Sequence, residues 1–388
     1  MPAELKSRYE RNLLESVVPF WENYSLDPGH GGQFTCLTRE GRIFDSRKYV
    51  WMNGRAVWTF SKLYNTVERK QSWRSAAASI LDFLLKHARD PQGRCYFSLT
   101  ADGKPVFLQR KPYSAFFLFL ALAEFYKTGA APESYRAEAI RLFHRVNEWI
   151  ADPSLLGRPA LDGQRPIRQL ADIMVIASMA MELLEIDPSE TWRQILRESI
   201  EQAKAHWLPE KRTLLENLPL DGSGYRDSPD TRLLCPGSAI EVAWFLIHAA
   251  EALGDESAVP FLLGVIEGSL ECGWDTQHGG LHYFMDADGL PPLQLEADMK
   301  LWWPHTEAIY ALALAYSKTK DEKWLAWLKR LDEYTFRTFV DWQYGEWFGY
   351  CDRQGHPANQ MKGGPYKGFF HVPRCLLFTI GRLGRLAG

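Results

Sequence analysis

Six turn dipeptides recur at nearly even spacing along the chain, and this repeat limits the folds that the sequence can adopt. Each pair places a polar residue before a glycine, and successive glycines lie about 60 to 67 residues apart. Because glycine accepts the positive φ of a tight hairpin, each pair predicts a turn between two short strands. The pairs are Glu40-Gly41, Asp102-Gly103, Asp162-Gly163, Asp221-Gly222, Asp288-Gly289 and Gln354-Gly355.

Two kinds of helical segment alternate between these turns. One kind has apolar residues three and four positions apart with charged residues between them, which is typical of helices that bury one face. The other kind is apolar nearly all round and must be buried on every side. The first set covers roughly residues 4–20, 72–89, 133–151, 189–207, 256–271 and 321–340, and the second set begins at Val50, Tyr113, Leu170, Ala239, Glu307 and Val372.

Six repeats of an outer helix, a hairpin loop and an inner helix predict an all-α fold, an (α/α)6 barrel or toroid with short β-hairpins in its connecting loops. An open helical solenoid is the alternative, but its terminal repeats would need polar outer faces. The last helix is among the most apolar, which favours a closed ring. No linker rich in serine, proline or glycine divides the chain, so we expect residues 1–388 to form one domain.

Polar and aromatic residues gather near the beginnings of the inner helices, which would all lie at one mouth of such a ring. A single charged residue on a buried helix is more often part of a structural ion pair than a catalytic residue. Five helices that carry them at the same end predict instead a polar pocket with aromatic walls, suited to a small sugar or polyol. These residues are Trp51, Asn53, Arg55, Arg168, Asp172, Ser238, Glu241, Lys300, Trp302, Trp303, His305, Glu307, Trp347, His371 and Arg374.

Charge and hydropathy narrow the classes of partner. The net charge is -3 and no long run has a single sign, so we expect neither a nucleic-acid partner nor a membrane partner. No segment reaches the length of a membrane span, and the N-terminus lacks the pattern of a signal peptide, so we expect a cytoplasmic protein. The six cysteines are scattered without metal-type spacing, which favours reduced thiols.

Two further patterns carry less weight. His278 and His282 lie four positions apart on a predicted strand with no third ligand nearby, so we expect no metal site there. The run KGGPYKG, residues 362–368, has glycines and lysines that could hold a phosphate, but it lacks the spacing of a Walker motif and the strand before it. We interpret this run as a loop that shapes the pocket.

Seven stretches together resemble the N-acylglucosamine 2-epimerase family. They are VVPFWENYSLDPGHGGQFTCL, WMNGRAVWTFSKL, LLCPGSAIEVAWF, HGGLHYFMDADGLPP, KLWWPHTEA, YGEWFGY and KGFFHVPR, and they run from about residue 15 to residue 380. The superfamily also includes cellobiose 2-epimerases and aldose-ketose isomerases acting on mannose-type sugars. The resemblance implies an (α/α)6 barrel and an isomerase that removes and returns the proton on C2 of an open-chain sugar.

The resemblance also implies roles for single residues. His371 would be the acid/base, a task that suits an imidazole because it titrates near neutral pH. Arg55 and Glu307 would flank the sugar, and Glu241 would orient a catalytic histidine one turn before it. We expect the substrate to be bound by Trp51, Asn53, Arg168, Asp172, Ser238, Trp303, His305 and Arg374. This chemistry requires no cofactor. The resemblance leaves ATP open as an allosteric activator, and it leaves a homodimer open as the assembly.

The chain departs from the family pattern at Ser238, where the family has a histidine. Epimerisation moves a proton between the two faces of C2, and the family uses one imidazole on each face. A serine hydroxyl cannot replace an imidazole unaided, because its pKa is far above neutral. Arg168 also stands where some N-acylglucosamine epimerases have lysine, and Asp172 is more similar to the cellobiose and mannose branches.

Four hypotheses follow from this departure. The first, which we expect, is a 2-epimerase of the N-acyl-D-glucosamine/N-acyl-D-mannosamine type, with His371 on one face of C2 and His305, His30 or a water on the other. The second is an aldose-ketose isomerase of the mannose/fructose type, which needs only one base. The third is a sugar-binding protein that has lost turnover. The fourth is a glycoside hydrolase or lyase with two carboxylates drawn from Asp172, Glu241 and Glu307.

Overall fold

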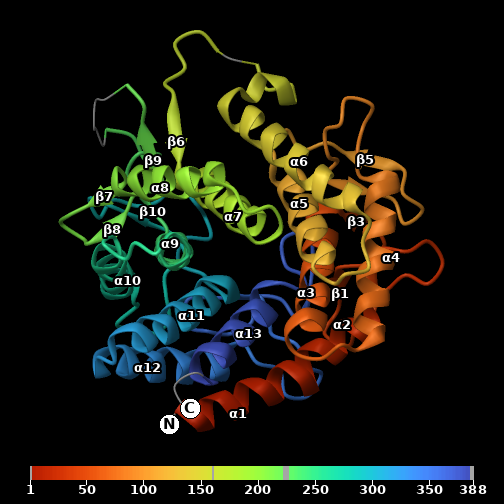
Figure 1. Ribbon diagram of the computed structural model, residues 1–388. Helices are drawn as coiled ribbons and strands as arrows, with labels where there is room; N and C mark the ends of the chain where they lie inside the picture. The colour runs from red at the N-terminus through yellow and green to blue at the C-terminus, as the bar shows by residue number, and fades with distance from the viewer. Residues whose placement is uncertain (1, 160, 222–226, 385–388) are drawn as a thin grey trace.

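The computed structural model of the chain describes residues 2–159, 161–221 and 227–384, whose helices form two concentric rings (Figure 1). The inner ring consists of α3 (Val50–Thr66), α5 (Tyr113–Tyr126), α7 (Leu170–Ile186), α9 (Pro236–Leu253), α11 (Trp302–Thr319) and α13 (His371–Gly384). The outer ring consists of α1 (Pro2–Asn12), α2 (Val18–Tyr24), α4 (Gln71–His87), α6 (Glu133–Ala151), α8 (Glu190–Lys204), α10 (Val259–Gly273) and α12 (Glu322–Thr338). This arrangement confirms the predicted (α/α)6 barrel.

The two rings differ in how much of each helix is buried. In α5, every residue from Ser114 to Phe125 is buried, because α3 and α7 lie beside it and α6 covers its outer side. In α8, burial follows one stripe that includes Trp192, Leu196 and Ile200, four positions apart. The hydrophobic pattern of the sequence therefore assigns each of these helices to its ring.

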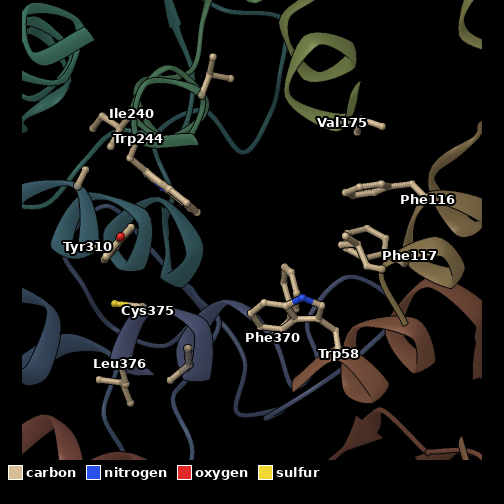
Figure 2. Packing of buried hydrophobic residues seen from close by; sticks show 14 of the residues in the cluster. Trp58, Phe116, Phe117, Val175, Ile240, Trp244, Tyr310, Phe370, Cys375 and Leu376 are labelled. Atoms are coloured by element: carbon tan, nitrogen blue, oxygen red, sulfur yellow. The ribbon is translucent and has the colours of Figure 1, made fainter. Parts of the chain in front are cut away.

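Aromatic side chains close the ring between its last and first inner helices. Trp58 of α3 meets Phe370 at a ring-centroid distance of 5.1 Å (Figure 2). Trp58 also meets Phe378 of α13 at 6.1 Å. The first outer helix, α1, packs against α13 as well. An open solenoid would leave these surfaces unpaired, so the chain forms a closed ring.

Short strands hold the beginnings of four inner helices at one end of the ring. They are β3 (Lys48–Tyr49), β6 (Ile167–Gln169), β10 (Leu233–Leu234) and β12 (Lys300–Leu301), each within one residue of the helix that follows. Their antiparallel partners are β4 (Ser98–Leu99), β9 (Asn217–Pro219), β11 (Met285–Asp286) and β13 (Tyr350–Cys351). Three further strands complete the loops: β5 (Pro105–Phe107) pairs with β4, β1 (Cys36–Leu37) pairs with β2 (Ile43–Asp45), and β7 (Trp207–Leu208) pairs with β8 (Thr213–Leu214).

The predicted turns have the backbone that glycine favours. The glycines of five turns have φ between 74° and 91°: Gly41, Gly103, Gly163, Gly289 and Gly355. Gly222, in the fourth turn, lies outside the described residues. At Gly41 a side chain would also collide with the Tyr24 ring, 2.3 Å from the position of an added Cβ. The five turns are confirmed, but not all of them are hairpins. Gly41 joins the paired strands β1 and β2, and Gly103 joins β4 and β5. Gly163 instead precedes β6, which pairs with β9, and Gly289 follows β11, which pairs with β10.

Helix boundaries differ from the expected ones where prolines lie. Helix α11 begins at Trp302 and not at Glu307, because Pro304 fits the first turn, where no N–H is needed. The first outer helix is interrupted by a π-helical turn, η1 (Leu13–Val17), directly before α2. Pro19 explains this turn, because its ring crowds the carbonyl four residues earlier, that of Glu15. A 3-10 turn, η2 (Pro153–Leu156), follows α6.

Two predicted features concern the whole chain. Across the described ranges, every helix falls short of the length or the apolar character that crossing a membrane requires. All six cysteines lie within those ranges, and none of them forms a disulfide.

Candidate active site

A cavity of about 590 Å³ opens at the end of the ring where the inner helices begin. Its size falls within the range of ligand pockets, about 300–1,000 Å³. Its polar wall is formed by Arg55, Ser238, Glu241, His371 and Arg374. An apolar wall is formed by Phe116, Phe117, Leu120, Met174 and Phe245. The cavity can therefore bind one part of a ligand through charged groups and another part through an apolar surface.

His371, the first residue of α13, is fixed by a carboxylate on the neighbouring helix α11. Its Nδ1 lies 2.8 Å from Oε1 of Glu307. The indole N–H of Trp244 donates to the other oxygen of Glu307 at 3.0 Å, which fixes the carboxylate in turn. Because the nearest partner of Nδ1 is an acceptor, we assign the ring proton to Nδ1. This tautomer leaves Nε2 as the basic nitrogen.

Burial sets the protonation state of the His371 ring. Desolvation, followed by the charges of Arg374 and Arg55, lowers the pKa of His371 well below its ordinary value of 6.5. Desolvation also raises the pKa of Glu307. A neutral imidazole at neutral pH can accept a proton, which is what a general base must do.

Arg374 lies between two carboxylates in the polar wall. One guanidinium nitrogen is 2.8 Å from Oε1 of Glu307 and also hydrogen-bonds Oε1 of Glu241. Burial opposes its charge, but the two carboxylates raise the pKa of Arg374 above its ordinary value. The guanidinium stays charged and links helices α9, α11 and α13 at the cavity.

One group of side chains in the described residues has the composition of a metal site. Ligand atoms of Glu241, Glu307 and His371 lie within 4.8 Å of one another. Arg374 already makes ion pairs with both carboxylates, so its positive charge stands where a cation would bind. His278 and His282 do not belong to this group. The chemistry of the donor set therefore does not favour a metal ion.

Arg55 is held by aromatic rings and not by an acid. Its guanidinium carbon lies 4.1 Å from the ring centroid of Phe117, 4.7 Å from that of Trp51 and 5.3 Å from that of Phe370. Among the residues that the structure describes, no carboxylate comes within ion-pair distance of it. Burial and the nearby Arg374 lower the pKa of Arg55 to about 9, so it remains a cation at neutral pH. Its positive charge is available to a ligand in the cavity.

Aromatic residues form the rim of the cavity. The indole N–H of Trp51 donates to the carbonyl of Pro365 at 2.8 Å, which ties the loop of residues 362–368 to helix α3. Tyr366 of the same loop lines the cavity, as the interpretation of this loop predicts. Trp303 also lines the cavity, with its ring centroid 6.0 Å from that of His371. Flat apolar rings of this kind can stack on a sugar.

The two lysines of that loop are buried in ion pairs. Nζ of Lys362 lies 2.9 Å from Asp341, and Nζ of Lys367 lies 2.8 Å from Glu346. Both lysine side chains are fully buried. The loop therefore does not present them to a phosphate.

Seven of the expected site residues line the cavity, and Glu307 stands directly behind them. The seven are Trp51, Arg55, Ser238, Glu241, Trp303, His371 and Arg374. The other four residues expected to bind the substrate, Asn53, Arg168, Asp172 and His305, do not line it. Of the wider set at the helix starts, Trp302 lines the cavity and Lys300 and Trp347 do not.

Asn53 and His305 bind the backbone, which corrects their expected place in the substrate pocket. The Asn53 side chain accepts from the Gln33 N–H at 2.7 Å and donates to the carbonyls of Gln33 and Tyr49. Nδ1 of His305 donates to the Leu301 carbonyl at 2.6 Å, and its Nε2 accepts from the N–H of Leu281 at 3.0 Å. Burial lowers the pKa of His305 to about 3. Both side chains are fully buried and serve the packing of loops on helix starts.

The remaining expected residues lie further out. Asp172, in the first turn of α7, lines a separate cavity of about 120 Å³ together with Arg158. Burial raises the pKa of Asp172 to about 6. Arg168 lies on β6, paired with Leu218. His30 is more than half exposed, and its Nδ1 lies 3.4 Å from Asp27.

Sequence reasoning missed two carboxylates: Glu296, which lines the cavity, and Glu216, which lies near it. Glu216 lies between β8 and β9, and its carboxyl group lies beside the side chain of Ser238. Burial raises the pKa of Glu216 to about 7. The signal that could have revealed it is a lone acid within the otherwise apolar run LLENLP.

The fold and the cavity together define an (α/α)6-barrel protein with an acid–base cluster at the mouth of its inner ring. The model of one family, N-acylglucosamine 2-epimerase (GlcNAc 2-epimerase), matches residues 32–375. The chain belongs to this family. It is 40% identical over 395 residues to N-acylglucosamine 2-epimerase of Mus musculus, across 98% of this chain and 92% of the mouse protein.

Solved structures of two other proteins share the fold. The cellobiose 2-epimerase of Spirochaeta thermophila DSM 6192 superimposes with a TM-score of 0.84 at 22% identity, over 100% of this chain and 98% of that one. A D-mannose isomerase superimposes with a TM-score of 0.84 at 17% identity, over 97% of each chain. At these identities the likeness concerns the fold alone.

Proposed function

We propose that this chain is a sugar 2-epimerase that interconverts N-acyl-D-glucosamine and N-acyl-D-mannosamine. Its curated relatives in the family are carbohydrate epimerases, which are isomerases. The observation that carries the proposal is the 2.8 Å contact between His371 and Glu307 at the wall of a sugar-sized cavity. This pair supplies a neutral, oriented imidazole, the group that abstraction of a proton next to a carbonyl requires.

In the proposed reaction His371 acts on the open-chain form of the sugar. Its Nε2 takes the proton from C2, and the electrons of the broken C–H bond move into the carbonyl group to give an enolate. Glu307 holds the ring and stabilises the imidazolium that forms. Arg55 lies at the cavity as an unpaired cation and would stabilise the oxygen of the enolate. Return of a proton to the other face of C2 gives the epimer.

The apolar wall supports an N-acylated substrate. Phe116, Phe117, Leu120, Met174 and Phe245 offer a surface that an acyl methyl group can occupy away from water. An unsubstituted hexose has no methyl group to place there. The charged wall opposite this surface would receive the carbonyl and C2.

An aldose-ketose isomerase is the second candidate, and Ser238 is the observation that favours it. Moving a proton between C2 and C1 on one face needs one base, and His371 would suffice. A hydrolase finds less support, because Glu241 and Glu307 both form ion pairs with Arg374 and Asp172 lies outside the cavity. Two carboxylates that share one guanidinium are not placed on either side of a scissile bond.

The products in D2O separate these functions. The enzyme is incubated with N-acetylmannosamine, N-acetylglucosamine, mannose or cellobiose, and proton NMR follows the anomeric and C2 signals. The proposed function predicts the 2-epimer of the N-acetylated sugars with deuterium at C2. Formation of a ketose would favour the second candidate, and a sugar that binds without exchange at any carbon would indicate lost turnover.

The remaining features of the proposed enzyme concern its cofactors, its assembly and its place in the cell. The proton transfer described above needs only the side chains of this chain, so we expect no required cofactor. The role of ATP as an activator is tested by adding it to the assay, and a homodimer by light scattering on the purified protein. The proposed substrate is a soluble metabolite, which fits a cytoplasmic enzyme.

A further inference from the structure

Glu216 is held beside the cavity by its backbone. Its N–H donates to the Leu233 carbonyl at 3.0 Å, and its carbonyl accepts from the N–H of Leu170 at 2.8 Å. These bonds tie it to strand β10, which leads into α9, and to the first residue of α7. The side chain is thereby placed at the mouth, although it belongs to neither helix.

The carboxyl group of Glu216 has few partners. Its Oε1 is shielded from solvent and has no hydrogen-bond partner. No lysine or arginine among the described residues lies within ion-pair distance, and the charged residue that acts on its pKa is another acid, Glu241. A carboxylate in such surroundings is costly unless it takes up a proton. Other titratable groups that face it are Cys235 and Tyr113, and neither is a cation.

Ser238 stands between this carboxyl group and the cavity. It is the third residue of α9, it lines the cavity, and its side chain lies beside the carboxyl group of Glu216. His371 enters the cavity from α13, and α11 separates α13 from α9 in the ring (Figure 1). Ser238 and His371 therefore approach a bound sugar from different sides.

The geometry points to Ser238, backed by Glu216, as the proton donor and acceptor on the second face of C2. This inference rests on the proposed 2-epimerase function. A serine hydroxyl alone is too weak an acid and too weak a base, but the carboxyl group behind it can supply or take the proton through it. In this arrangement Glu216 is a positioning and proton-holding residue, and Ser238 is the group that touches the sugar.

The proton balance of the proposed step is complete. His371 Nε2 takes the C2 proton, and the enolate then takes the hydroxyl proton of Ser238 as a new C–H bond on the other face. The Ser238 oxygen regains a proton from Glu216 at the same time. One turnover leaves an imidazolium and a Glu216 carboxylate, and exchange with water restores both. The reverse reaction uses the same groups in opposite roles.

The test compares inversion at C2 with deuterium uptake at C2 in D2O, starting separately from N-acetylglucosamine and from N-acetylmannosamine. In Ser238→Ala and in Glu216→Gln, we expect inversion to fall about 100-fold or more. Deuterium uptake should persist in one of the two sugars, because His371 can still remove and return the proton on its own face. Ser238→Thr keeps a hydroxyl group and should retain more inversion than Ser238→Ala.

A matched control removes another buried carboxylate. Glu124 lies near the far end of α5, where it hydrogen-bonds Asn65 at 2.8 Å, so Glu124→Gln should leave inversion intact. Wild-type inversion in both Ser238→Ala and Glu216→Gln would overturn the inference and leave the epimerase standing. Equal loss of inversion and of deuterium uptake in Glu216→Gln would also overturn it, in favour of a structural role. A wild-type enzyme that makes only a ketose would instead overturn the proposed function and the inference with it.

Discussion

Nδ1 of His371 lies 2.8 Å from Oε1 of Glu307, and the two residues belong to inner helices, α13 and α11, that pack side by side. The contact joins positions 64 residues apart in sequence. It turns a histidine at a helix start into an oriented base with a free Nε2.

Replacing Glu307 with glutamine should lower kcat about 100-fold or more, with a smaller change in KM. The amide keeps the size of the side chain but no longer stabilises the imidazolium of His371, and it can present its NH2 group to Nδ1. Steady-state kinetics with N-acetylmannosamine measures the effect. A kcat close to that of the wild type would show that the pair does not orient the base.

The pH dependence of kcat/KM should place the acid limb well below pH 6.5. Desolvation, Arg374 and Arg55 lower the pKa of His371, so the ring stays neutral and basic as the pH falls through 6.5. Activity is then lost only below the lowered pKa. The charge of Glu241 raises the pKa of His371, and the charge of Lys367 lowers it further. An acid limb at or above pH 6.5, in a protein that stays folded there, would contradict this protonation state.

Replacing Arg374 with methionine should cost about 3–5 kcal/mol in the free energy of unfolding. The change leaves Glu241 and Glu307 buried with no cation between them. Urea unfolding at pH 7 measures the loss. Arg197→Met is the matched control, because its ion pair with Glu190 is exposed on α8 and should contribute no more than about 1 kcal/mol. Equal losses in the two variants would contradict the argument from burial.

Two helical glycines should respond to alanine in opposite directions. A Cβ at Gly54 of α3 would lie 2.5 Å from the backbone oxygen of Phe117 on α5, so Gly54→Ala should cost about 1–3 kcal/mol. A Cβ at Gly264 of α10 would meet nothing within 4 Å. Gly264→Ala should therefore add about 0.5–1 kcal/mol of stability. Thermal unfolding of both variants tests whether α3 and α5 need this close approach.

The ring could be predicted from sequence because its signals are local and repeated. The distribution of apolar residues in helices such as α5 and α8 predicts whether each helix lies in the inner or the outer ring. A turn such as Glu40-Gly41 is specified by two adjacent residues. The resemblance to the N-acylglucosamine 2-epimerase family, carried by motifs such as KGFFHVPR, is confirmed by the family match. Hydrophobic periodicity and turn chemistry thus determine most of the fold.

The contents of the cavity were harder to predict. Asn53 and His305 lie near helix starts, as the residues that line the cavity do. The sequence does not reveal that their polar atoms are hydrogen-bonded to backbone groups and so are not available to a ligand. Glu216 belongs to a loop, and its approach to Ser238 depends on how β9 and β10 are placed. Lys362 and Lys367 similarly form ion pairs with Asp341 and Glu346, and the sequence alone does not predict these pairs. Contacts between repeats decide which polar groups remain free for a ligand.

The central claim is that His371 removes the proton from C2, and deuterium uptake tests it most directly. Wild-type protein and His371→Ala are incubated in D2O separately with N-acetylmannosamine and with N-acetylglucosamine, and the loss of the C2 proton signal is followed by NMR. The account predicts uptake in both sugars by the wild type and, in the variant, a loss of about 10²–10⁴-fold in at least one of them, with unfolding at an unchanged or similar temperature. Uptake at the wild-type rate in both sugars by His371→Ala would contradict the account.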